Sequence, residues 1–284
     1  MTSERVPTGV HEGLVSLLQG VAVNAAFAAG KVIRASFGKA PHIERSLPHD
    51  LKLWLDRAAE DEILRVIRTS FPDDAVLSEE KGYEPGREPF VWIIDPLDGT
   101  VNFHHGMPFF CTSIACYSVS APAADDPAHR LPDGRMLGDP VVGVVYDPMR
   151  DELFIGTAGG GASLNRAPLL VPETTRLDEA VVAVSFGARD ESIACMTTLL
   201  PFLIRRARKV RSFGSTALDI VQVAAGRYGA FFQKGTNLWD FAAAAIVARA
   251  AGAVVDVKEY APGRFQILAS AEGIFEELHG QAEG

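Results

Sequence analysis

The sequence has few cysteines, no long apolar run and no apolar leader. Its three cysteines, Cys111, Cys116 and Cys195, are odd in number and lack the spacing of a metal site. Such sparse thiols favour a reducing compartment over a disulfide-stapled secreted scaffold. No stretch approaches the length of a membrane span, and the polar segment Met1–Glu12 lacks the core of a signal peptide. We therefore expect a soluble, cytoplasmic protein that does not enter a membrane.

Positive charge is scarce too. The chain carries 27 Lys and Arg against 36 Asp and Glu, a formal net charge of −9, and its pI is near 5.3. A nucleic-acid backbone requires clustered Lys and Arg, so the composition argues against that partner. The run Arg205–Arg211 is the exception, and we interpret it as a solvated helix end that leads into a strand. Arg211 could still point at an anionic substrate.

Length and composition leave room for one large domain or two closely packed ones. The 284 residues are 48% hydrophobic and 22% charged, which is ample material for a core. We find no internal repeat. The composition changes near Thr174–Asp178, and we predict a boundary there, between residues 1–176 and 177–284.

The first part is predicted to hold two helices and an antiparallel sheet, which is an α+β arrangement. Apolar residues at helical spacing predict helices over His11–Phe37 and from about Leu53 to Ser70. Ser120–Asp139 has the composition of a loop, and we interpret it as a surface insertion, with a lid or an oligomer contact as the alternative. The expected strands are Ala75–Leu77, Val91–Ile94, Thr112–Val119, Val141–Tyr146 and Glu152–Gly156.

In the second part, predicted strands and helices alternate. The strands are Val181–Phe186, Lys209–Phe213, Ala230–Gln233 and Val254–Val257. The helices are Ser192–Ile204, Thr216–Ala225, Trp239–Ala251 and a last one from Glu272. Alternation of this kind predicts a largely parallel α/β layer, so the fold class of the whole chain is α/β.

An apolar strand in the first part runs directly into two carboxylates, Asp95 and Asp98. Pro96 stiffens the turn, so both carboxylates can be held on one side of it. Gly99 lets the backbone approach a ligand closely, and Thr100 adds a hydroxyl. Two fixed carboxylates repel each other unless a cation lies between them, and Mg²⁺ is a hard cation that prefers oxygen ligands. This segment suits a magnesium site, but two aspartates at this spacing, taken alone, more often form a solvated turn.

The surrounding segment, from Trp92 to Pro108, resembles the signature of the inositol monophosphatase family. The family pattern is Trp-x-Ile-Asp-Pro-x-Asp-Gly-Thr-x-Asn-Phe with a proline a few residues later, and every position is matched. The resemblance covers about residues 10 to 280, with three acidic blocks in the family's order. It implies a layered αβαβα sandwich of the inositol monophosphatase and fructose-1,6-bisphosphatase type, dependence on Mg²⁺, sensitivity to Li⁺ and a homodimer.

The resemblance extends the metal site beyond Asp95 and Asp98. It adds Glu79, in a Ser-Glu-Glu where the family has Gly-Glu-Glu, and Asp240, in a Leu-Trp-Asp block. Asp240 also falls at the start of a predicted helix, where a carboxylate is favoured. Leu97 offers the natural backbone carbonyl between the two aspartates, and waters would complete the octahedral coordination of two or three Mg²⁺ ions.

The reaction implied is hydrolysis of a phosphate monoester by direct attack of water, with inversion at phosphorus and no protein nucleophile. Thr100 would orient that water, with Asp56 or Glu79 as its polar partner. The resemblance aligns Asp56 with a residue that serves a more weakly held metal and the water. The amides of Gly99 and Thr100 would hold phosphate oxygens.

The substrate alcohol is expected to meet a segment in which Gln233 stands where the family has a Glu that accepts bonds from sugar hydroxyls. A Gln can donate as well as accept and carries no charge. The neighbouring Lys234 adds a cation that a second phosphate or a carboxylate could use. The expected substrate contacts are Asp98, Gly99, Thr100, Arg211, Gly214, Ser215, Thr216, Gln233 and Asp240.

Inositol 1-phosphate or a related sugar or polyol phosphate is the predicted substrate. Histidinol phosphate, fructose 1,6-bisphosphate, 3′-phosphoadenosine 5′-phosphate and NADP are the alternatives. A haloacid-dehalogenase-type phosphatase needs two aspartates near the N-terminus with a single residue between them. Asp95 and Asp98 have two residues between them and lie far from the N-terminus, so we discount this class of enzyme. A non-catalytic regulatory protein on the same fold is the alternative from another class. Because every predicted ligand and Thr100 are present, an enzyme is the stronger prediction.

Overall fold

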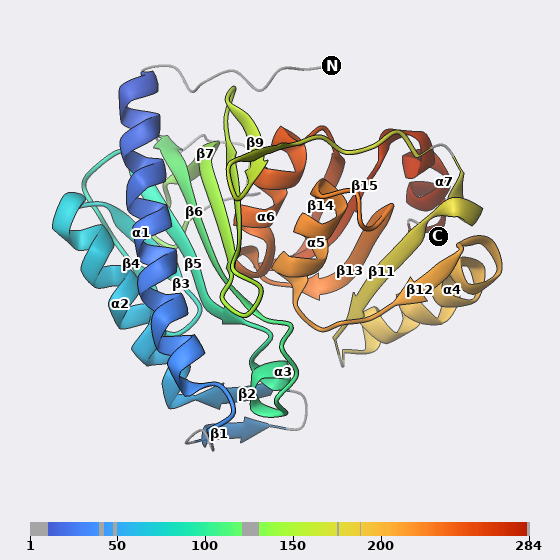
Figure 1. The fold of residues 1–284 in the computed structure, drawn as a ribbon, viewed down its shortest axis with the longest axis horizontal. Coiled ribbons are helices and arrows are strands. Elements are labelled where there is room, and N and C mark those ends of the chain that lie inside the picture. The colour runs from blue at the N-terminus through green and yellow to red at the C-terminus, as the bar shows by residue number, and fades with distance from the viewer. Residues whose placement is uncertain are drawn as a thin grey trace.

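Two long helices pack side by side on one face of the molecule (Figure 1). Helix α1 (Glu12–Ser36) begins after His11, whose Nδ1 accepts from the Leu14 amide at 3.2 Å. Helix α2 (Trp54–Ser70) follows a hairpin of β1 (Ile43–Leu47) and β2 (Asp50–Leu53). The two helices agree with the predicted ones, whereas the hairpin was not predicted. The computed structural model describes residues 11–39, 43–47, 50–120, 131–174, 176–187 and 189–282.

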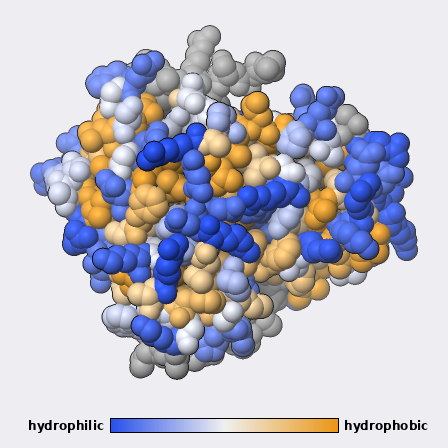
Figure 2. Space-filling model, in the orientation of Figure 1, coloured by the Kyte–Doolittle hydropathy of each residue, from blue (hydrophilic) through white to orange (hydrophobic). Residues whose placement is uncertain are grey.

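Helix α1 is the one helix among the described residues that is long and apolar enough to cross a membrane, so the expectation that no segment reaches this length was wrong. The structure uses this helix as a core element instead. Its stripe of Leu18, Ala22, Ala25, Ala29 and Ile33 is buried in the cluster beneath it. Figure 2 shows apolar side chains at the surface around α1, where Leu17 and Phe27 are exposed.

The first sheet has eight strands in the order β10-β9-β8-β7-β6-β5-β3-β4. All neighbours are antiparallel except β3 and β5, which run parallel, so the antiparallel prediction fails at that pair alone. The strands are β3 (Ala75–Ser78), β4 (Gly82–Glu84), β5 (Phe90–Asp98), β6 (Cys111–Ser120), β7 (Met136–Asp147), β8 (Glu152–Thr157), β9 (Gly161–Leu164) and β10 (Ala167–Leu169).

The second sheet has five strands in the order β12-β11-β13-β15-β14. Strand β11 pairs in parallel with β12 and β13, but β15 pairs antiparallel with both β13 and β14. The prediction of a largely parallel layer was therefore wrong for half of the pairings. It overlooked β15, which follows β14 through a tight turn at Gly263 (φ 66°). The strands are β11 (Val181–Phe186), β12 (Lys209–Arg211), β13 (Ala230–Thr236), β14 (Val254–Ala261) and β15 (Arg264–Ser270).

Helices separate and flank the two sheets in five layers, as the resemblance implied. Helices α1 and α2 cover the first sheet, α5 (Thr216–Ala224) and α6 (Leu238–Ala250) lie between the sheets, and α4 (Asp190–Arg206) and α7 (Glu272–Ala282) cover the outer face of the second (Figure 1). The short elements are α3 (Thr100–His104) and a single 3₁₀ turn, Leu177–Glu179. The αβαβα sandwich is confirmed.

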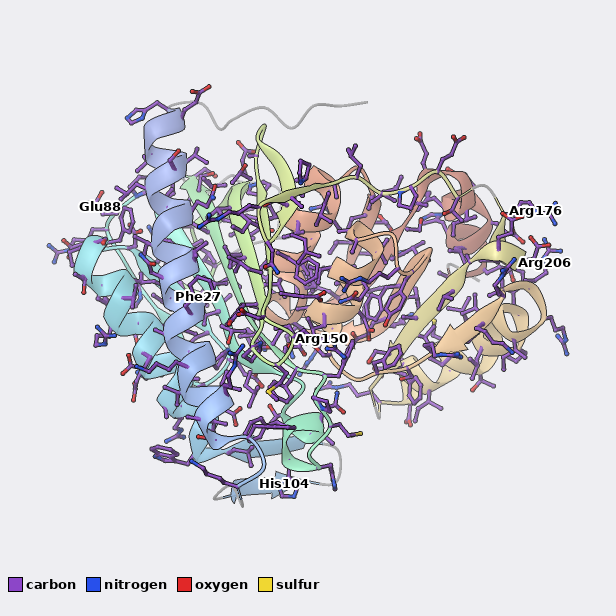
Figure 3. The ribbon with its side chains drawn as sticks, in the orientation of Figure 1. Phe27, Glu88, His104, Arg150, Arg176 and Arg206 are labelled. Carbon is purple, nitrogen blue, oxygen red and sulfur yellow. The ribbon has the colours of Figure 1, made fainter. Side chains whose placement is uncertain are left out.

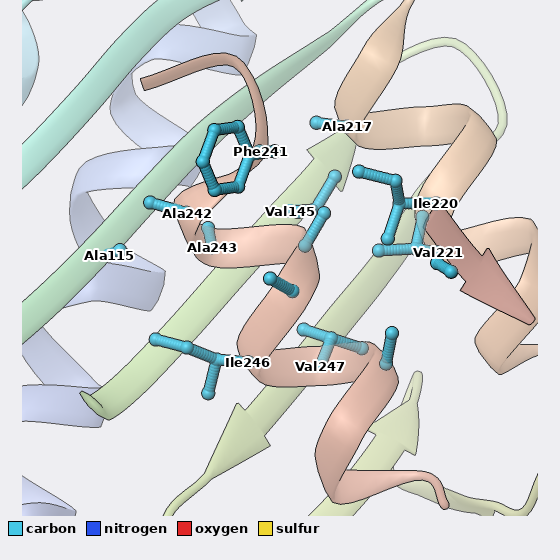
Figure 4. Close-up of a cluster of buried hydrophobic side chains, with 14 of the residues drawn as sticks. Ala115, Val145, Ala217, Ile220, Val221, Phe241, Ala242, Ala243, Ile246 and Val247 are labelled. Atoms are coloured by element: carbon cyan, nitrogen blue, oxygen red, sulfur yellow. The ribbon is translucent and has the colours of Figure 1, made fainter. Parts of the chain in front are cut away.

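Helix α6 forms the centre of the molecule because its side chains are small. Figure 4 shows its alanines and Ile246 between the strands of the first sheet and α5. Two glycines of the sheet make this close approach possible. A Cβ at Gly143 would lie 2.3 Å from the Ala243 carbonyl oxygen, and one at Gly156 would lie 2.6 Å from the Val247 Cα.

Two predictions about the course of the chain stand apart from these elements. Residues 121–130 of the predicted Ser120–Asp139 insertion lie outside the described residues, and Met136–Asp139 belong to β7 rather than to a loop. The boundary between residues 1–176 and 177–284 stays a prediction.

Arg176 and Arg206 lie at the far end of the second sheet (Figure 3), where Arg206 pairs with Glu277 at 2.6 Å.

Candidate active site

The residues at the end of β5 form a buried acidic turn that is held by hydrogen bonds between its own residues. The Leu97 amide donates to Asp95 Oδ1 at 3.0 Å, and the Leu97 carbonyl accepts from Thr100 Oγ1 at 3.0 Å. Asp95 pairs with Ser113 and Asp98 with Cys111 on β6, and the register shifts between the two pairs, so a bulge separates the two aspartates. Gly99 ends the turn with φ 98°, a conformation that favours glycine, and caps α3.

Asp98 joins the two halves of the molecule. Its Oδ2 accepts from Ser215 Oγ and from the Ala217 amide, both at 2.7 Å, at the first turn of α5. The pKa of Asp98 is raised to about 7, because burial and the charge of Asp240 outweigh the lowering by the hydrogen bond from Ser215. Cys111 contacts the same oxygen, with its Sγ 3.9 Å from Asp98 Oδ2. The carboxylate is therefore held from the first sheet and from the start of α5.

Acidic side chains from four segments gather around Asp95. Burial raises the pKa of Asp95 well above its usual range, and the charges of four other carboxylates raise it further, namely those of Glu79, Asp98, Asp240 and Asp56. The Glu79 amide donates to the Ile94 carbonyl at 3.2 Å, which holds the end of β3 beside β5. The structure thus brings together all five predicted carboxylates.

Asp56 and Thr100 meet although they are 44 positions apart in the chain. Asp56 lies in the first turn of α2, where its Oδ2 accepts from the Leu53 amide at 2.6 Å. Its Oδ1 accepts from Thr100 Oγ1 at 3.4 Å. The Thr100 hydroxyl therefore lies between a carboxylate and the Leu97 carbonyl, and its lone pairs remain able to accept a hydrogen bond from a third group.

Asp240 lies in the first turn of α6, three residues after Asn237, which caps the N-terminus of this helix. Its Oδ2 accepts from Thr236 Oγ1 and from the Asn237 amide, both at 2.8 Å, and from Asn237 Nδ2 at 3.2 Å. Asn237 was not among the predicted site residues. The spacing Asn-x-x-Asp at a predicted helix start is the sequence signal that could have indicated it.

On the predicted alcohol side, Gly214 (φ 83°), Ser215 and Thr216 lead into α5. Thr216 Oγ1 donates to Gln233 Oε1 at 2.7 Å, so these two predicted substrate contacts pair with each other. Ser215 is already bonded to Asp98, and thus helps to position that carboxylate. Asn102, which was not a predicted contact, fixes this loop by donating to the Phe213 carbonyl at 2.7 Å.

Two predicted contributors do not join the cluster. Arg211 is exposed, and its guanidinium donates to the carbonyl of Val210, in its own strand, at 3.0 Å. Lys234 follows Gln233 on β13 and therefore points to the opposite face of the sheet. There its Nζ lies 5.2 Å from the centre of the Tyr260 ring. The idea that Lys234 serves a second phosphate beside Gln233 does not fit this geometry.

The donor set suits a hydrated hard cation. Every group gathered around Asp95 is an oxygen donor, and burial together with neighbouring carboxylates raises the pKa of both Asp95 and Asp98. Among the described residues, no three acidic, histidine or cysteine side chains already enclose a point as in a closed metal cage. Mg²⁺ keeps several waters and takes only one or two carboxylates, so an open oxygen site of this kind fits it.

Comparisons with known proteins place these observations in a family. The family model for the inositol monophosphatase family matches residues 15–124 and 136–282. An inositol-1-monophosphatase from Synechocystis sp. is 36% identical, over 98% of this chain and 92% of that protein. A protein named Nus factor SuhB from Escherichia coli (strain K12) is 37% identical, over 83% of each chain.

Solved structures agree with the sequence comparisons. The extragenic suppressor protein suhB from Bartonella henselae superposes with a TM-score of 0.83 and 31% identity, over 94% of this chain and 98% of that one. An inositol monophosphatase from Anabaena superposes with a TM-score of 0.76 and 32% identity, over 95% and 96%. The gap in the family match at residues 125–135 falls within the predicted insertion.

Proposed function

The chain belongs to the inositol monophosphatase family and is a phosphoric monoester hydrolase, and we propose that it hydrolyses a small phosphorylated polyol in a Mg²⁺-dependent reaction. Inositol 1-phosphate or a related sugar phosphate is the proposed substrate. The observation that carries this proposal is the convergence of five carboxylates, from α2, the end of β3, β5 and α6, on the turn that follows Asp95.

The proposed ligands are carboxylates already oriented by their neighbours. Glu79, Asp95, Asp98 and Asp240 would hold the ions together with the Leu97 carbonyl. In Asp98 and Asp240, the described hydrogen bonds all fall on Oδ2, which leaves Oδ1 to face a cation. When bound, Mg²⁺ supplies compensation for this charge, polarisation of the phosphate and a lowered pKa of water.

Thr100 is proposed to orient the attacking water. Its hydroxyl donates toward the Leu97 carbonyl or Asp56, so a lone pair is available to accept a hydrogen bond from water. Asp56, or Glu79, would take up the proton that the water releases. Water then attacks phosphorus in line with the alcohol oxygen, the phosphorus–oxygen ester bond breaks, and the departing alcohol oxygen takes up a proton from solvent water. The amides of Gly99 and Thr100, exposed by the left-handed turn, would bind phosphate oxygens.

Gln233 is proposed to read the alcohol. Its Oε1 accepts from Thr216, so the Nε2 amide remains to donate to a substrate hydroxyl. A neutral donor at this position tolerates an alcohol that carries negative charge better than a glutamate would. Fructose 1,6-bisphosphate, 3′-phosphoadenosine 5′-phosphate and NADP therefore remain in the substrate panel, and histidinol phosphate, whose alcohol is cationic, is included as a contrast.

The test is phosphate release by the purified protein from this panel, with Mg²⁺ and with EDTA, and with Li⁺ as an added inhibitor. Turnover of one substrate that requires Mg²⁺ is expected, and Asp95→Asn should abolish it. If the folded protein binds Mg²⁺ but releases phosphate from none of the substrates, the substrate assignment is wrong. If it binds no Mg²⁺, the proposed chemistry fails altogether.

A regulatory role is the second candidate, because several relatives that are 36–37% identical are named Nus factor SuhB. The two roles can be separated by expressing the Asp95→Asn variant in cells that lack the wild-type protein. A binding function would survive the loss of turnover, whereas a catalytic function would not. We also propose a cytoplasmic location, which the three free cysteines support. The homodimer rests on the family resemblance, and light scattering of the purified protein tests it.

A further inference from the structure

Arg264, at the start of β15, reaches the turn that precedes Asp240. Its Nη1 donates to Asn237 Oδ1 at 2.5 Å. The strand pairing sets this approach, because Phe265 pairs with Thr236 across a β-bulge, which places Arg264 beside the end of β13. Arg264 is half-buried, so its guanidinium lies against the protein rather than free in water.

Asn237 is held at both ends of its amide. Its Nδ2 donates to Asp240 Oδ2, while its Oδ1 accepts from Arg264. An amide turned the other way would place Oδ1 against the carboxylate and Nδ2 against the guanidinium, and a guanidinium can only donate. Arg264 therefore helps to fix which way the Asn237 amide faces, and that amide adds a third hydrogen bond to Asp240 Oδ2, beside those from Thr236 and from the Asn237 backbone.

We propose that Arg264 is a positioning residue that acts through Asn237 to hold the Asp240 carboxylate with Oδ2 occupied and Oδ1 directed at the metal site. This inference rests on the proposed function, because it assigns a role to a neighbour of a proposed Mg²⁺ ligand. Arg264 is not among the proposed metal ligands or substrate contacts, and its described hydrogen bond goes to Asn237. Groups that orient metal ligands in this way typically change metal affinity by about 10- to 100-fold when they are removed.

A simple counter-charge is the competing account of Arg264. Its positive charge lowers the pKa of Asp240 and opposes the effect of burial. A cation near the site also repels a bound cation, so its removal would strengthen Mg²⁺ binding if charge alone mattered. Positioning predicts the reverse, because a carboxylate that can rotate binds the ion less well. The two accounts therefore differ in the sign of one measurable effect.

The experiment measures binding of Mg²⁺ alone by calorimetry, together with the rise in Tm that Mg²⁺ produces. Arg264→Met should weaken Mg²⁺ binding by roughly tenfold or more, and Arg264→Lys should recover part of the loss because its Nζ can still donate to Asn237. Asn237→Leu should match Arg264→Met, and the double variant should be no worse than either one. Arg249→Met is the matched control, because Arg249 lies at the other end of α6 and donates to the Val255 carbonyl.

Unchanged or tighter Mg²⁺ binding by Arg264→Met would overturn the proposal, and so would losses that multiply in the double variant. If Arg264→Met does not fold, Asn237→Leu decides, since it leaves Arg264 in place and wild-type affinity in that variant would also overturn the proposal. Absence of Mg²⁺ binding by the wild-type protein would instead remove the proposed function itself, which keeps the two failures distinct.

Discussion

Asp219 offers the sharpest test of the electrostatics inside the molecule. It is fully buried on α5, and neither of its carboxylate oxygens has a hydrogen-bond partner among the described residues. Burial, together with the charge of Asp98, raises its pKa from 3.8 to about 8. The folded protein therefore keeps Asp219 protonated at neutral pH, whereas the unfolded chain releases that proton.

This difference makes stability depend on pH in a defined direction. The folded state binds one more proton than the unfolded state between pH 4 and pH 8, so the free energy of unfolding falls as pH rises through that window. The slope is about 1.4 kcal/mol per pH unit. About 3 units separate the ordinary pKa of 3.8 from pH 7, so this one group accounts for a loss of about 4 kcal/mol over that interval.

The assay is urea unfolding at a series of pH values in EDTA, for the wild type and for Asp219→Asn. The difference between the two proteins should fall by about 1.4 kcal/mol for each pH unit from 5 to 8, because the contributions of all other groups largely cancel. Asp219→Leu is the control, since it also cannot titrate and should show the same flattened slope at a different absolute stability. Parallel curves for the wild type and both variants would refute the reasoning.

Three further predictions concern packing and chemistry. Gly156→Ala should lower the free energy of unfolding in urea by about 1–3 kcal/mol, because its Cβ would meet the backbone of Val247. Gly20→Ala is the control and should not lower it, because there is open space around Gly20. Equal effects of the two substitutions would contradict the packing argument. Thr100→Ala should lower kcat by roughly 10²–10⁴-fold with Mg²⁺ binding unchanged, and Thr100→Ser should keep most activity; a full-rate Ala variant would exclude a role in orienting water. Gln233→Glu should raise kcat/KM several-fold for inositol 1-phosphate relative to fructose 1,6-bisphosphate, and an unchanged ratio would show that Gln233 does not read the alcohol.

Local sequence determined much of the first sheet and the acidic turn. Helical spacing predicted α1 and α2 to within a residue or two of their ends. The order of a strand, two carboxylates, Gly99 and Thr100 predicted a sharp change of direction after β5, because proline fixes its own φ and glycine permits a positive φ; β5 itself continues to Asp98, four residues past the predicted end. These features depend on residues that are close together in the sequence, so they can be predicted from the sequence alone.

Tertiary structure decided the rest of the site. Strand β15 was missed, and with it Arg264, since a strand's partner and direction depend on packing rather than on its own residues. The bond from Ser215 to Asp98 joins positions 117 apart, and no local pattern predicts it. Lys234 and Gln233 are neighbours in sequence, but the pleat of β13 sends them to opposite faces. The sequence alone named the carboxylates; the packing of two sheets around α5 and α6 determined which oxygens they present and which neighbours hold them.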